Sequence, residues 1–318
     1  MSDPVDVLAG SDPVAAVLAA YRDGDRLLLR TGGTTGAPRV VVRTAASWVD
    51  SFPTYAELAG IGPDTVVGVP GPMTATMNLF AVAQARWAGA RHTHDPEDAT
   101  HVVLTPAQLH AVLDADAARP GTVAVVAGDR LAPALAARAR AAGLVVHHYY
   151  GAAELSFVAW GPHAEQLSVF PGVEAVARDG ELFVRSPYVA EGVADADGWA
   201  GVGDRGHVVG TRVIVHGRPG TVTTAGATVV VSAVEAALAD LGVVVVGIPH
   251  PRLGAVLAAV LPGSVGIAAA RRAARDRLPS SHRPRRWVHR ETLPLTRHGK
   301  IDREALARAL AADPQELP

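Results

Sequence analysis

Hydrophobic residues occur along the chain in short blocks, which become regular between residues 101 and 150. HVVL, TVAVV and LVVHHYY are short and rich in β-branched residues, which is typical of buried strands. Between them lie PAQLHAVLDAD, which opens on Pro106, and APALAARARAAG, which closes at Gly143, as helices do. This alternation predicts parallel strand–helix–strand units, in which ligands bind beyond the carboxyl ends of the strands.

The segments on either side of this region follow a looser pattern. Before residue 30, AAVLAAYR predicts a helix and RLLLR a strand, and residues 44–60 predict a helix that Pro53 divides. TVVGVP predicts a buried strand, and a helix that ends near Gly89 follows it. Between residues 172 and 217 the hydrophobic runs shorten into β-like pieces such as ELFVRS and RVIVHG. All of this suits one large α/β domain.

A second pattern begins after Gly217. SAVEAALADLG, GIAAARRAARDRL and REALARAL predict helices, and VVVVGIP, AVLAAVLPG and WVHRETLP predict strands. About 100 residues of this kind can fold as a domain of their own. We therefore predict an α/β protein with a large domain over residues 1–217, built on a mostly parallel sheet with flanking helices. A small α+β domain over residues 218–318 follows, joined by a hinge at residues 218–220.

Composition narrows the class of protein. The 318 residues are 49% hydrophobic and 19% charged, which suits a globular chain with an ample core. A net charge of -2 gives no reason to expect nucleic acid or a membrane surface as a partner, and the absence of cysteine excludes disulfides and thiolate ligands. The acidic, proline-containing amino terminus does not resemble a signal peptide, and the apolar runs are too short for a membrane span. We expect a cytoplasmic protein.

The stretch TGGTTGAPR, residues 31–39, carries the first candidate chemistry. Its glycines let backbone approach a ligand closely, and its N–H groups, hydroxyls and one cation suit phosphate oxygens. It does not match G-x-x-x-x-G-K-[ST] or G-x-G-x-x-G, and by itself it could equally be a tight turn. The candidate phosphate-binding residues are Thr31, Gly32, Gly33, Thr34, Thr35, Gly36 and Arg39.

Further candidates follow predicted strands. AGDR contains Gly128 and Asp129, and YGAAE contains Tyr150, Gly151, Ala152 and Glu154. The tyrosine could stack on a flat base and the glutamate could hold Mg²⁺, although a surface carboxylate at a strand end is the plainer interpretation. Asp204 in VGDRG, Arg218 and Gly226 come later, and LPLTRHGKIDR holds Lys300, the single lysine among 29 basic residues. Keeping one compact ammonium in such an arginine-rich chain suggests a specific role for it.

Five of these segments resemble, in the same order, motifs of the adenylate-forming superfamily, which includes acyl-CoA synthetases, peptide-synthetase adenylation domains and luciferases. The family's loop usually reads S/T-S/G-G-T-T-G-x-P-K, with Arg39 here in place of lysine. The segments that resemble Y-G-x-T-E, W-x-x-T-G-D-x-G and G-R-x-D depart from them at the fourth position of each motif, where the chain has Ala153, Val202 and Gly220. L-P-x-T-x-x-G-K-I-D-R is matched almost residue for residue.

The resemblance implies roles for these residues. Tyr150 would lie on adenine, Glu154 would bind the Mg²⁺ of ATP, and Asp204 would accept hydrogen bonds from the ribose hydroxyls. Arg218 would contact ribose or phosphate, and Lys300 would bridge the carboxylate and the α-phosphate. The expected catalytic residues are Lys300, Arg39 and Glu154, with Glu154 as the metal ligand. Gly128, Asp129, Gly151, Ala152 and Gly226 would belong to the nucleotide-binding segments.

The resemblance also implies ATP, Mg²⁺ and CoA as cofactors, and a small carboxylic acid as substrate. In length and layout the chain is similar to the short o-succinylbenzoate-CoA ligases. Residues 73–78 and 155–157 would line the acid pocket, and their largely apolar character favours a compact apolar or aryl acid.

Three alternatives stay open at this stage. The acceptor could be the pantetheine of a carrier protein. The departures at Ala153, Val202 and Gly220 could mark a degenerate nucleotide-binding protein without turnover. The loop lies near residue 30 here and well inside the chain in family members, so an amino-terminal portion is expected to be absent. A homodimer or a partner could supply it.

Overall fold

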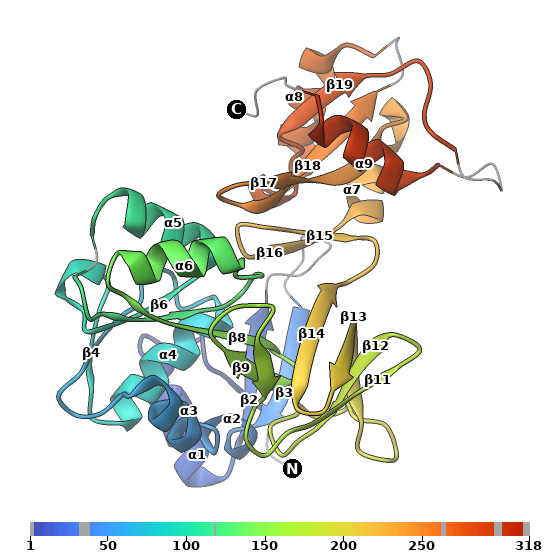
Figure 1. Ribbon diagram of the computed structural model, residues 1–318. Helices are drawn as coiled ribbons and strands as arrows, with labels where there is room; N and C mark the ends of the chain where they lie inside the picture. Colours follow the sequence, from blue (N-terminus) through green and yellow to red (C-terminus); the bar gives the residue numbers. More distant parts are fainter. Residues whose placement is uncertain (1–2, 32–38, 118, 262–264, 296–300, 314–318) are drawn as a thin grey trace. The chain divides into compact units, whose positions relative to one another are not determined.

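The computed structural model describes residues 3–31, 39–117, 119–261, 265–295 and 301–313 of the chain. It divides into two compact units, which meet in the sequence between Pro219 and Gly220. Figure 1 labels the elements of both units, and each unit is described by itself.

The first unit is organised around an 11-stranded sheet, in the order β11-β12-β13-β14-β10-β9-β8-β7-β6-β4-β5. The pairs from β5 to β8 are parallel, and the pairs from β8 to β11 are antiparallel. The parallel strands are β4 (Val66–Gly68), β5 (Arg91–Thr93), β6 (His101–Leu104), β7 (Val123–Val126) and β8 (Val145–Ala152). The antiparallel strands are β9 (Ser156–Gly161), β10 (Leu167–Val169), β11 (Glu174–Arg178), β12 (Glu181–Arg185), β13 (Ala200–Val209) and β14 (Arg212–Gly217).

Helices cover both faces of the parallel strands, which explains their continuous hydrophobic runs. Val102 and Val126 pack with α5 (Pro106–Asp114) and α6 (Pro133–Ala141) in one hydrophobic cluster. The neighbouring Val103 and Val125 point to the opposite face and belong to the cluster that holds α4. Figure 1 shows α5 and α6 on one side of these strands and α4 on the other.

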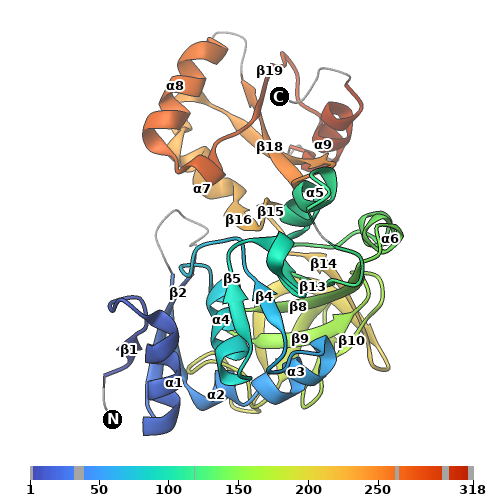
Figure 2. The ribbon, with the colours of Figure 1, turned by 90° about the vertical axis from the view of Figure 1, so that its left-hand side faces the viewer.

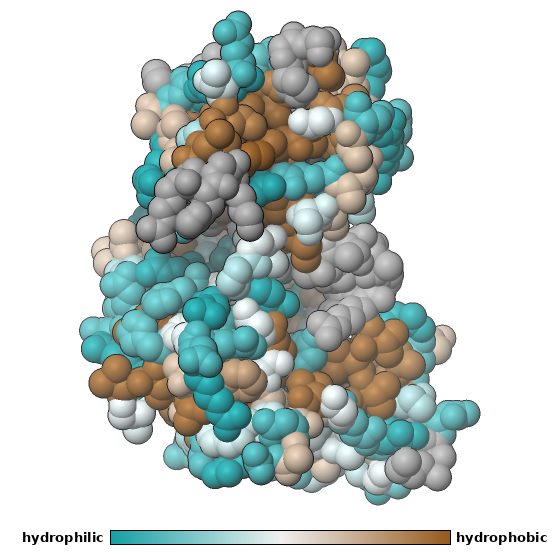
Figure 3. Space-filling view, turned by 90° about the vertical axis from the view of Figure 1, so that its right-hand side faces the viewer, coloured by the Kyte–Doolittle hydropathy of each residue, from teal (hydrophilic) through white to brown (hydrophobic). Residues whose placement is uncertain are grey.

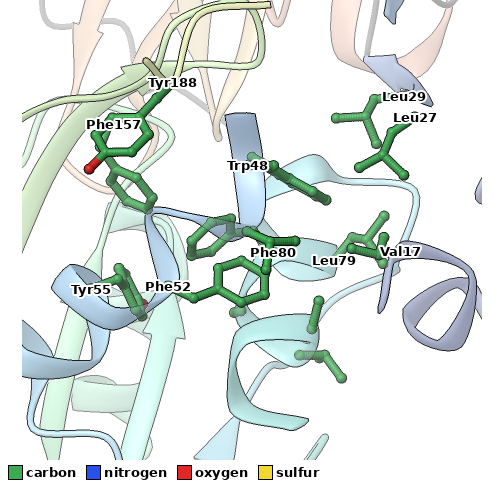
Figure 4. Close-up of a cluster of buried hydrophobic side chains, with 14 of the residues drawn as sticks. Val17, Leu27, Leu29, Trp48, Phe52, Tyr55, Leu79, Phe80, Phe157 and Tyr188 are labelled. Atoms are coloured by element: carbon green, nitrogen blue, oxygen red, sulfur yellow. The ribbon is translucent and has the colours of Figure 1, made fainter. Parts of the chain in front are cut away.

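The second face is filled by an aromatic cluster centred on Phe80 of α4 (Thr76–Trp87). Its ring lies 4.9 Å from that of Phe52, 5.3 Å from Tyr55 and 4.9 Å from Phe157, all near edge-on (Figure 4). These rings come from helices and from a strand distant in the sequence, so the cluster joins the layers of the unit. The neighbouring elements are β1 (Val5–Asp6), α1 (Pro13–Asp23), β2 (Arg26–Thr31), β3 (Arg39–Thr44), α2 (Ala46–Val49) and α3 (Phe52–Ala59), with β1-β2-β3 forming a small sheet.

The second unit is an α+β sandwich around β17 (Val244–His250) and β18 (Gly254–Leu261). Two helices pack on one face of this sheet, and a third packs on the other face with Ile248 and Val256 (Figure 2). The former are α7 (Val231–Ala237) and α8 (Ile267–Arg277), and the latter is α9 (Arg303–Ala311). The remaining strands are β15 (Thr221–Thr224), β16 (Ala227–Val230) and β19 (Arg286–His289), and short 3-10 turns lie at Ala239–Leu241 and Ser280–His282. A further 3-10 turn, at Pro96–Asp98, belongs to the first unit.

The predicted α/β class is confirmed, and most predicted elements are present. Pro53 divides the helix over residues 44–60 as expected, because it lies in the first turn of α3, where a missing N–H costs nothing. The strand predicted over WVHRETLP covers only its first residues, and the hairpin β15–β16 was not predicted. Among the described residues, no helix combines the length and apolar character needed to cross a membrane.

Candidate active site

Three of the predicted site residues meet at the carboxylate of Asp204. Tyr150, on β8, donates its hydroxyl hydrogen to Asp204 Oδ2 at 2.7 Å. Arg218, which follows β14, donates from Nε to Asp204 Oδ1 at 3.0 Å. The carboxylate, on β13, is only 15% exposed, so strands from distant parts of the chain bring together a phenol, an acid and a guanidinium.

The Tyr150 hydroxyl is held in its neutral, donating form. Burial raises the pKa of Tyr150 well above its ordinary value, and the charge and hydrogen bond of Asp204 raise it further. Each carboxylate oxygen of Asp204 has a second lone pair beyond the one that these bonds use. Asp204 is therefore fixed in place and still able to accept hydrogen bonds from vicinal hydroxyls.

A tight turn follows Tyr150 and carries Glu154. The pairing of β8 with β9 shifts register between Tyr150 and Gly151. A Cβ at Gly151 would lie 2.2 Å from the carbonyl oxygen of Ser156, so this position requires glycine. Ser156 itself has a φ of 59°, in the left-handed region. Glu154 is half-buried, and its backbone oxygen accepts from Ala190 N–H at 2.8 Å.

Arg43 was not singled out in the sequence, and the structure places it against this turn. It is fully buried on β3, and its Nη1 donates to the carbonyl oxygen of Ala153 at 2.9 Å. The available signal was alternation, because Val41 and Arg43 occupy the same face of a strand whose other face is more exposed. A buried arginine in such a register has to hydrogen-bond to its surroundings.

The segment after β7 lies at the carboxyl edge of the parallel strands, as predicted. Gly128 has a φ of 81°, and a Cβ placed there would lie 3.8 Å from Met77 Sδ and 3.5 Å from Thr105 Cγ2. Burial raises the pKa of Asp129 to about 6, against the opposing effect of a hydrogen bond from the Arg130 backbone N–H. An apolar wall and a carboxyl of raised pKa therefore lie at this edge.

The other predicted site residues fall in three groups. Gly32, Gly33, Thr34, Thr35, Gly36 and Lys300 lie outside the described residues. Thr31 ends β2 and Arg39 begins β3, and the two are paired in the hairpin that the loop joins. Gly226 lies in the turn between β15 and β16 in the second unit, with a φ of 84°.

The donor set fits Mg²⁺ that arrives with a nucleotide. No group of three or more histidine or acidic side chains suited to a metal occurs within the described part of the chain. Mg²⁺ commonly takes one or two carboxylates and fills its remaining positions with phosphate oxygens and water. Glu154 is such a single carboxylate, and it lies on the turn next to the Tyr150–Asp204–Arg218 cluster.

The chain is similar to several known proteins at low sequence identity. No protein-family model matches the chain. The uncharacterized acyl-CoA ligase YhfT of Bacillus subtilis is 25% identical over 324 residues, which cover 88% of this chain and 67% of YhfT. The amide bond synthetase McbA of Marinactinospora thermotolerans is 24% identical, with a TM-score of 0.74 and coverage of 89% of this chain and 69% of McbA. A double mutant of o-succinylbenzoate CoA synthetase from Bacillus subtilis is 20% identical, with a TM-score of 0.75 and coverage of 89% and 69%.

The solved structures confirm the predicted fold, and the curated relatives agree with the family that the motifs indicated. The ordered motifs resemble those of the adenylate-forming superfamily, the solved structures share the fold, and the curated relative YhfT is named as an acyl-CoA ligase.

Proposed function

We propose that the protein is an AMP-forming acid–thiol ligase that converts a carboxylic acid into its CoA thioester at the expense of ATP. The observation that carries the proposal is the cluster of Tyr150, Asp204 and Arg218, which offers an aromatic ring, a carboxylate with free lone pairs and a cation in one place. A purine ring, a ribose diol and a phosphate need these three groups. The curated relative YhfT is named as an acyl-CoA ligase.

The proposed reaction has two steps. An oxygen of the substrate carboxylate attacks the α-phosphorus of ATP, the bond to the β-phosphate oxygen breaks, and pyrophosphate leaves. The thiolate of CoA then attacks the acyl carbonyl, and AMP leaves with the electron pair of the mixed-anhydride bond. Negative charge builds on the phosphate oxygens in the first step, and preorganised donors stabilise it there.

The residues divide this work between them. Asp204 and Arg218 orient the nucleoside, and Arg39 and the residues 31–36 hold phosphate oxygens. Lys300 lies between the carboxylate and the α-phosphate in the first step. Glu154 holds Mg²⁺, which when bound neutralises charge on the phosphates.

The acid that we favour is compact and apolar or aryl. The thioether of Met77 and the methyl group of Thr105 lie beside Gly128 at the edge of the sheet where the acid would bind. These groups offer apolar contacts and no charge to pair with an amino group or a second carboxylate.

Pyrophosphate release from Mg·ATP, measured over a panel of aliphatic, aryl and amino acids with and without CoA, tests the proposal. We expect release that depends on one class of acid, and a CoA thioester detected by mass spectrometry. Asp204→Ala should abolish release, because the carboxylate also holds Tyr150 and Arg218 in place. The matched control is Asp50→Ala, since Asp50 also accepts from a tyrosine hydroxyl, that of Tyr21 at 2.8 Å, but lies outside the proposed site.

Other outcomes would favour the alternatives. Acid-dependent release without a CoA product, with the acyl-AMP trapped by hydroxylamine, would favour a carrier-protein pantetheine as acceptor. ATP binding without release for any acid would favour a degenerate binding protein, to which the departures at Ala153, Val202 and Gly220 would then be ascribed. Reactivity confined to amino acids would contradict the proposed acid class.

The same preparation should be examined by light scattering. Figure 3 shows hydrophobic residues gathered in patches on the surface of each unit. Val40 and Trp87 are 46% and 43% exposed, respectively. A homodimer that covers apolar surface of this kind is part of the proposal, and a clean monomer would remove that part.

A further inference from the structure

Arg43 is a buried cation with an unusual position in the chain. It follows Arg39 by four residues, on the strand that leaves the loop at residues 31–39, and its exposed fraction is 0%. Val41, two residues before it on the same face of β3, is 4% exposed and belongs to the hydrophobic core. Placing a guanidinium on this face is costly unless its N–H groups all find acceptors.

Its hydrogen bonds reach three separate segments. Nε and Nη2 donate to Oγ and to the carbonyl oxygen of Ser47 at 3.1 and 3.0 Å. Nη1 donates to the carbonyl oxygen of Ala153 at 2.9 Å, and Nη2 also donates to that of Tyr188. These acceptors are neutral oxygens, so the guanidinium acts through its planar fork of donors and not as half of an ion pair.

Backbone hydrogen bonds tie the same segments together around Arg43. The N–H of Glu191 donates to Val42 at 3.0 Å, and that of Ala190 donates to Glu154 at 2.8 Å. Residues 188–191 therefore link β3 to the Glu154 turn. Arg43, on β3, adds buried hydrogen bonds to Tyr188 and to Ala153. The ring of Tyr188 lies 6.0 Å from that of Phe170, which stacks on Phe157 at 4.9 Å, so the aromatic cluster supports this corner as well.

The charge of Arg43 also faces the Glu154 side chain. Burial lowers the pKa of the Arg43 guanidinium to about 9, and the Glu154 carboxylate acts in the opposite direction. The group is therefore a cation at neutral pH, and Glu154 is the anion that balances it.

We propose that Arg43 is a positioning residue, which fixes the turn carrying Glu154 to strand β3 so that the carboxylate is preorganised for the Mg²⁺ of the bound nucleotide. This inference rests on the proposed function, in which Glu154 is the metal ligand. Groups that orient a metal ligand typically change metal affinity 10–100-fold when they are removed.

The test uses Arg43→Met, Arg43→Lys and the control Val41→Ala. Methionine keeps much of the volume and leaves three carbonyl oxygens without their donor. Lysine keeps the charge, but it cannot reach three segments at once. Val41→Ala removes buried methyl groups from the same face of the same strand and removes no hydrogen bond to the Glu154 turn. ATP binding to each full-length protein is measured by calorimetry over a series of Mg²⁺ concentrations and in excess EDTA.

We expect Arg43→Met to raise the Mg²⁺ concentration needed for half-maximal ATP binding about tenfold, and Arg43→Lys to raise it less. ATP binding in EDTA should change less than about twofold in both, because a merely unstable protein would not lose the metal-dependent part selectively. Val41→Ala should lower the melting temperature and leave the Mg²⁺ dependence as in the parent.

An unchanged Mg²⁺ dependence in a folded Arg43→Met protein would overturn the inference, whatever its melting temperature. If that variant does not fold, Arg43→Lys decides in the same way. Failure of the proposed function would look different. The parent protein itself would then bind ATP no better with Mg²⁺ and release no pyrophosphate, and both proposals would fall. A parent that releases pyrophosphate beside variants of normal Mg²⁺ dependence would remove only the role of Arg43.

Discussion

Asp129 has a pKa that folding raises into a range where urea unfolding can be measured on both sides of it. Its pKa is raised from an ordinary value of 3.8 to about 6, chiefly by burial, so ionising it costs more in the folded than in the unfolded chain. The stability that belongs to the neutral carboxyl is present at low pH, and it is lost as the pH rises from the unfolded value through the folded one. Asp129→Asn should therefore be more stable than the parent at pH 7.5.

That gain should shrink by about 1 kcal/mol at pH 5, a figure reduced to allow for partial exposure of the carboxyl. Urea unfolding at the two pH values measures it. Asparagine keeps the acceptor for the Arg130 backbone N–H, which lies 2.6 Å from Asp129 Oδ1. Asp95→Asn is the control, because Asp95 makes a similar turn contact to Glu97 N–H at 2.9 Å while exposed. A gain that is the same at both pH values would contradict the prediction.

Among single residues, the sequence predicted those that would contact the nucleotide better than those that hold such residues in place. Tyr150, Asp204 and Arg218 stood out because each lies in a recognisable motif, and the structure brings them together. Arg43 lies in no motif, and its importance depends on acceptors from Ala153 and Tyr188, which only the folded chain places beside it. A residue whose partners are backbone atoms of distant segments leaves almost no mark on the sequence.

Among the elements, the hairpin of β15 and β16 offers a local test of backbone strain. Its two turn residues, Ala225 and Gly226, have φ values of 49° and 84°, as a two-residue hairpin of the I′ type requires. The Cβ of alanine makes this conformation unfavourable by about 1–2 kcal/mol. Glycine avoids that strain, but the greater conformational freedom of its unfolded state lowers stability by about 0.5–1 kcal/mol. Ala225→Gly should thus stabilise the protein by about 0.5–1 kcal/mol in urea unfolding.

Ala227→Gly is the matched control, since Ala227 is the first residue of β16 and gains nothing from a left-handed option. It should destabilise the protein by about 0.5–1 kcal/mol. Destabilisation by both substitutions would show that the turn carries no strain.

The same hairpin shows why some elements escaped prediction. The parallel strands and their helices were visible because long hydrophobic runs alternate with proline and glycine at fixed places. The Thr105 capping box of α5 adds a further local signal. TVTTAGATVVV has the β-branched residues of two strands, but Ala-Gly is not a typical I′ pair, so nothing in it indicated the reversal. Pairing of β15 with β18 in the folded chain stabilises this hairpin, which the local sequence favours only weakly.

For the whole molecule, the central question is how the two units divide the reaction. The chain separates at Pro219 and Gly220, and Gly220 has a φ of 70°, open to no other residue without strain. The motif with Lys300 belongs to the sequence after this point, and most of the nucleotide-binding motifs precede it. We propose that the second unit is a mobile lid, which brings the lysine to the acid for the first step and withdraws it for the second.

Lys300→Ala tests this division by separating the half-reactions. The ammonium is needed where the carboxylate oxygen attacks the α-phosphate, because it offsets charge on both, and no other lysine exists to replace it. Acyl-AMP formation, followed as acid-dependent pyrophosphate release, should fall at least about a hundredfold, as is usual when one preorganised charge is lost. Thioester formation from supplied acyl-AMP and CoA should stay within about threefold of the parent, since the lysine is proposed to have been withdrawn before that step. Arg308→Ala removes an exposed cation of α9, which lies 3.9 Å from the Glu304 carboxylate, and should leave both steps intact. Equal loss of both steps in Lys300→Ala would mean that the lysine stabilises the fold or binds the nucleotide in both steps. That result would contradict the proposed movement of the second unit between the two steps.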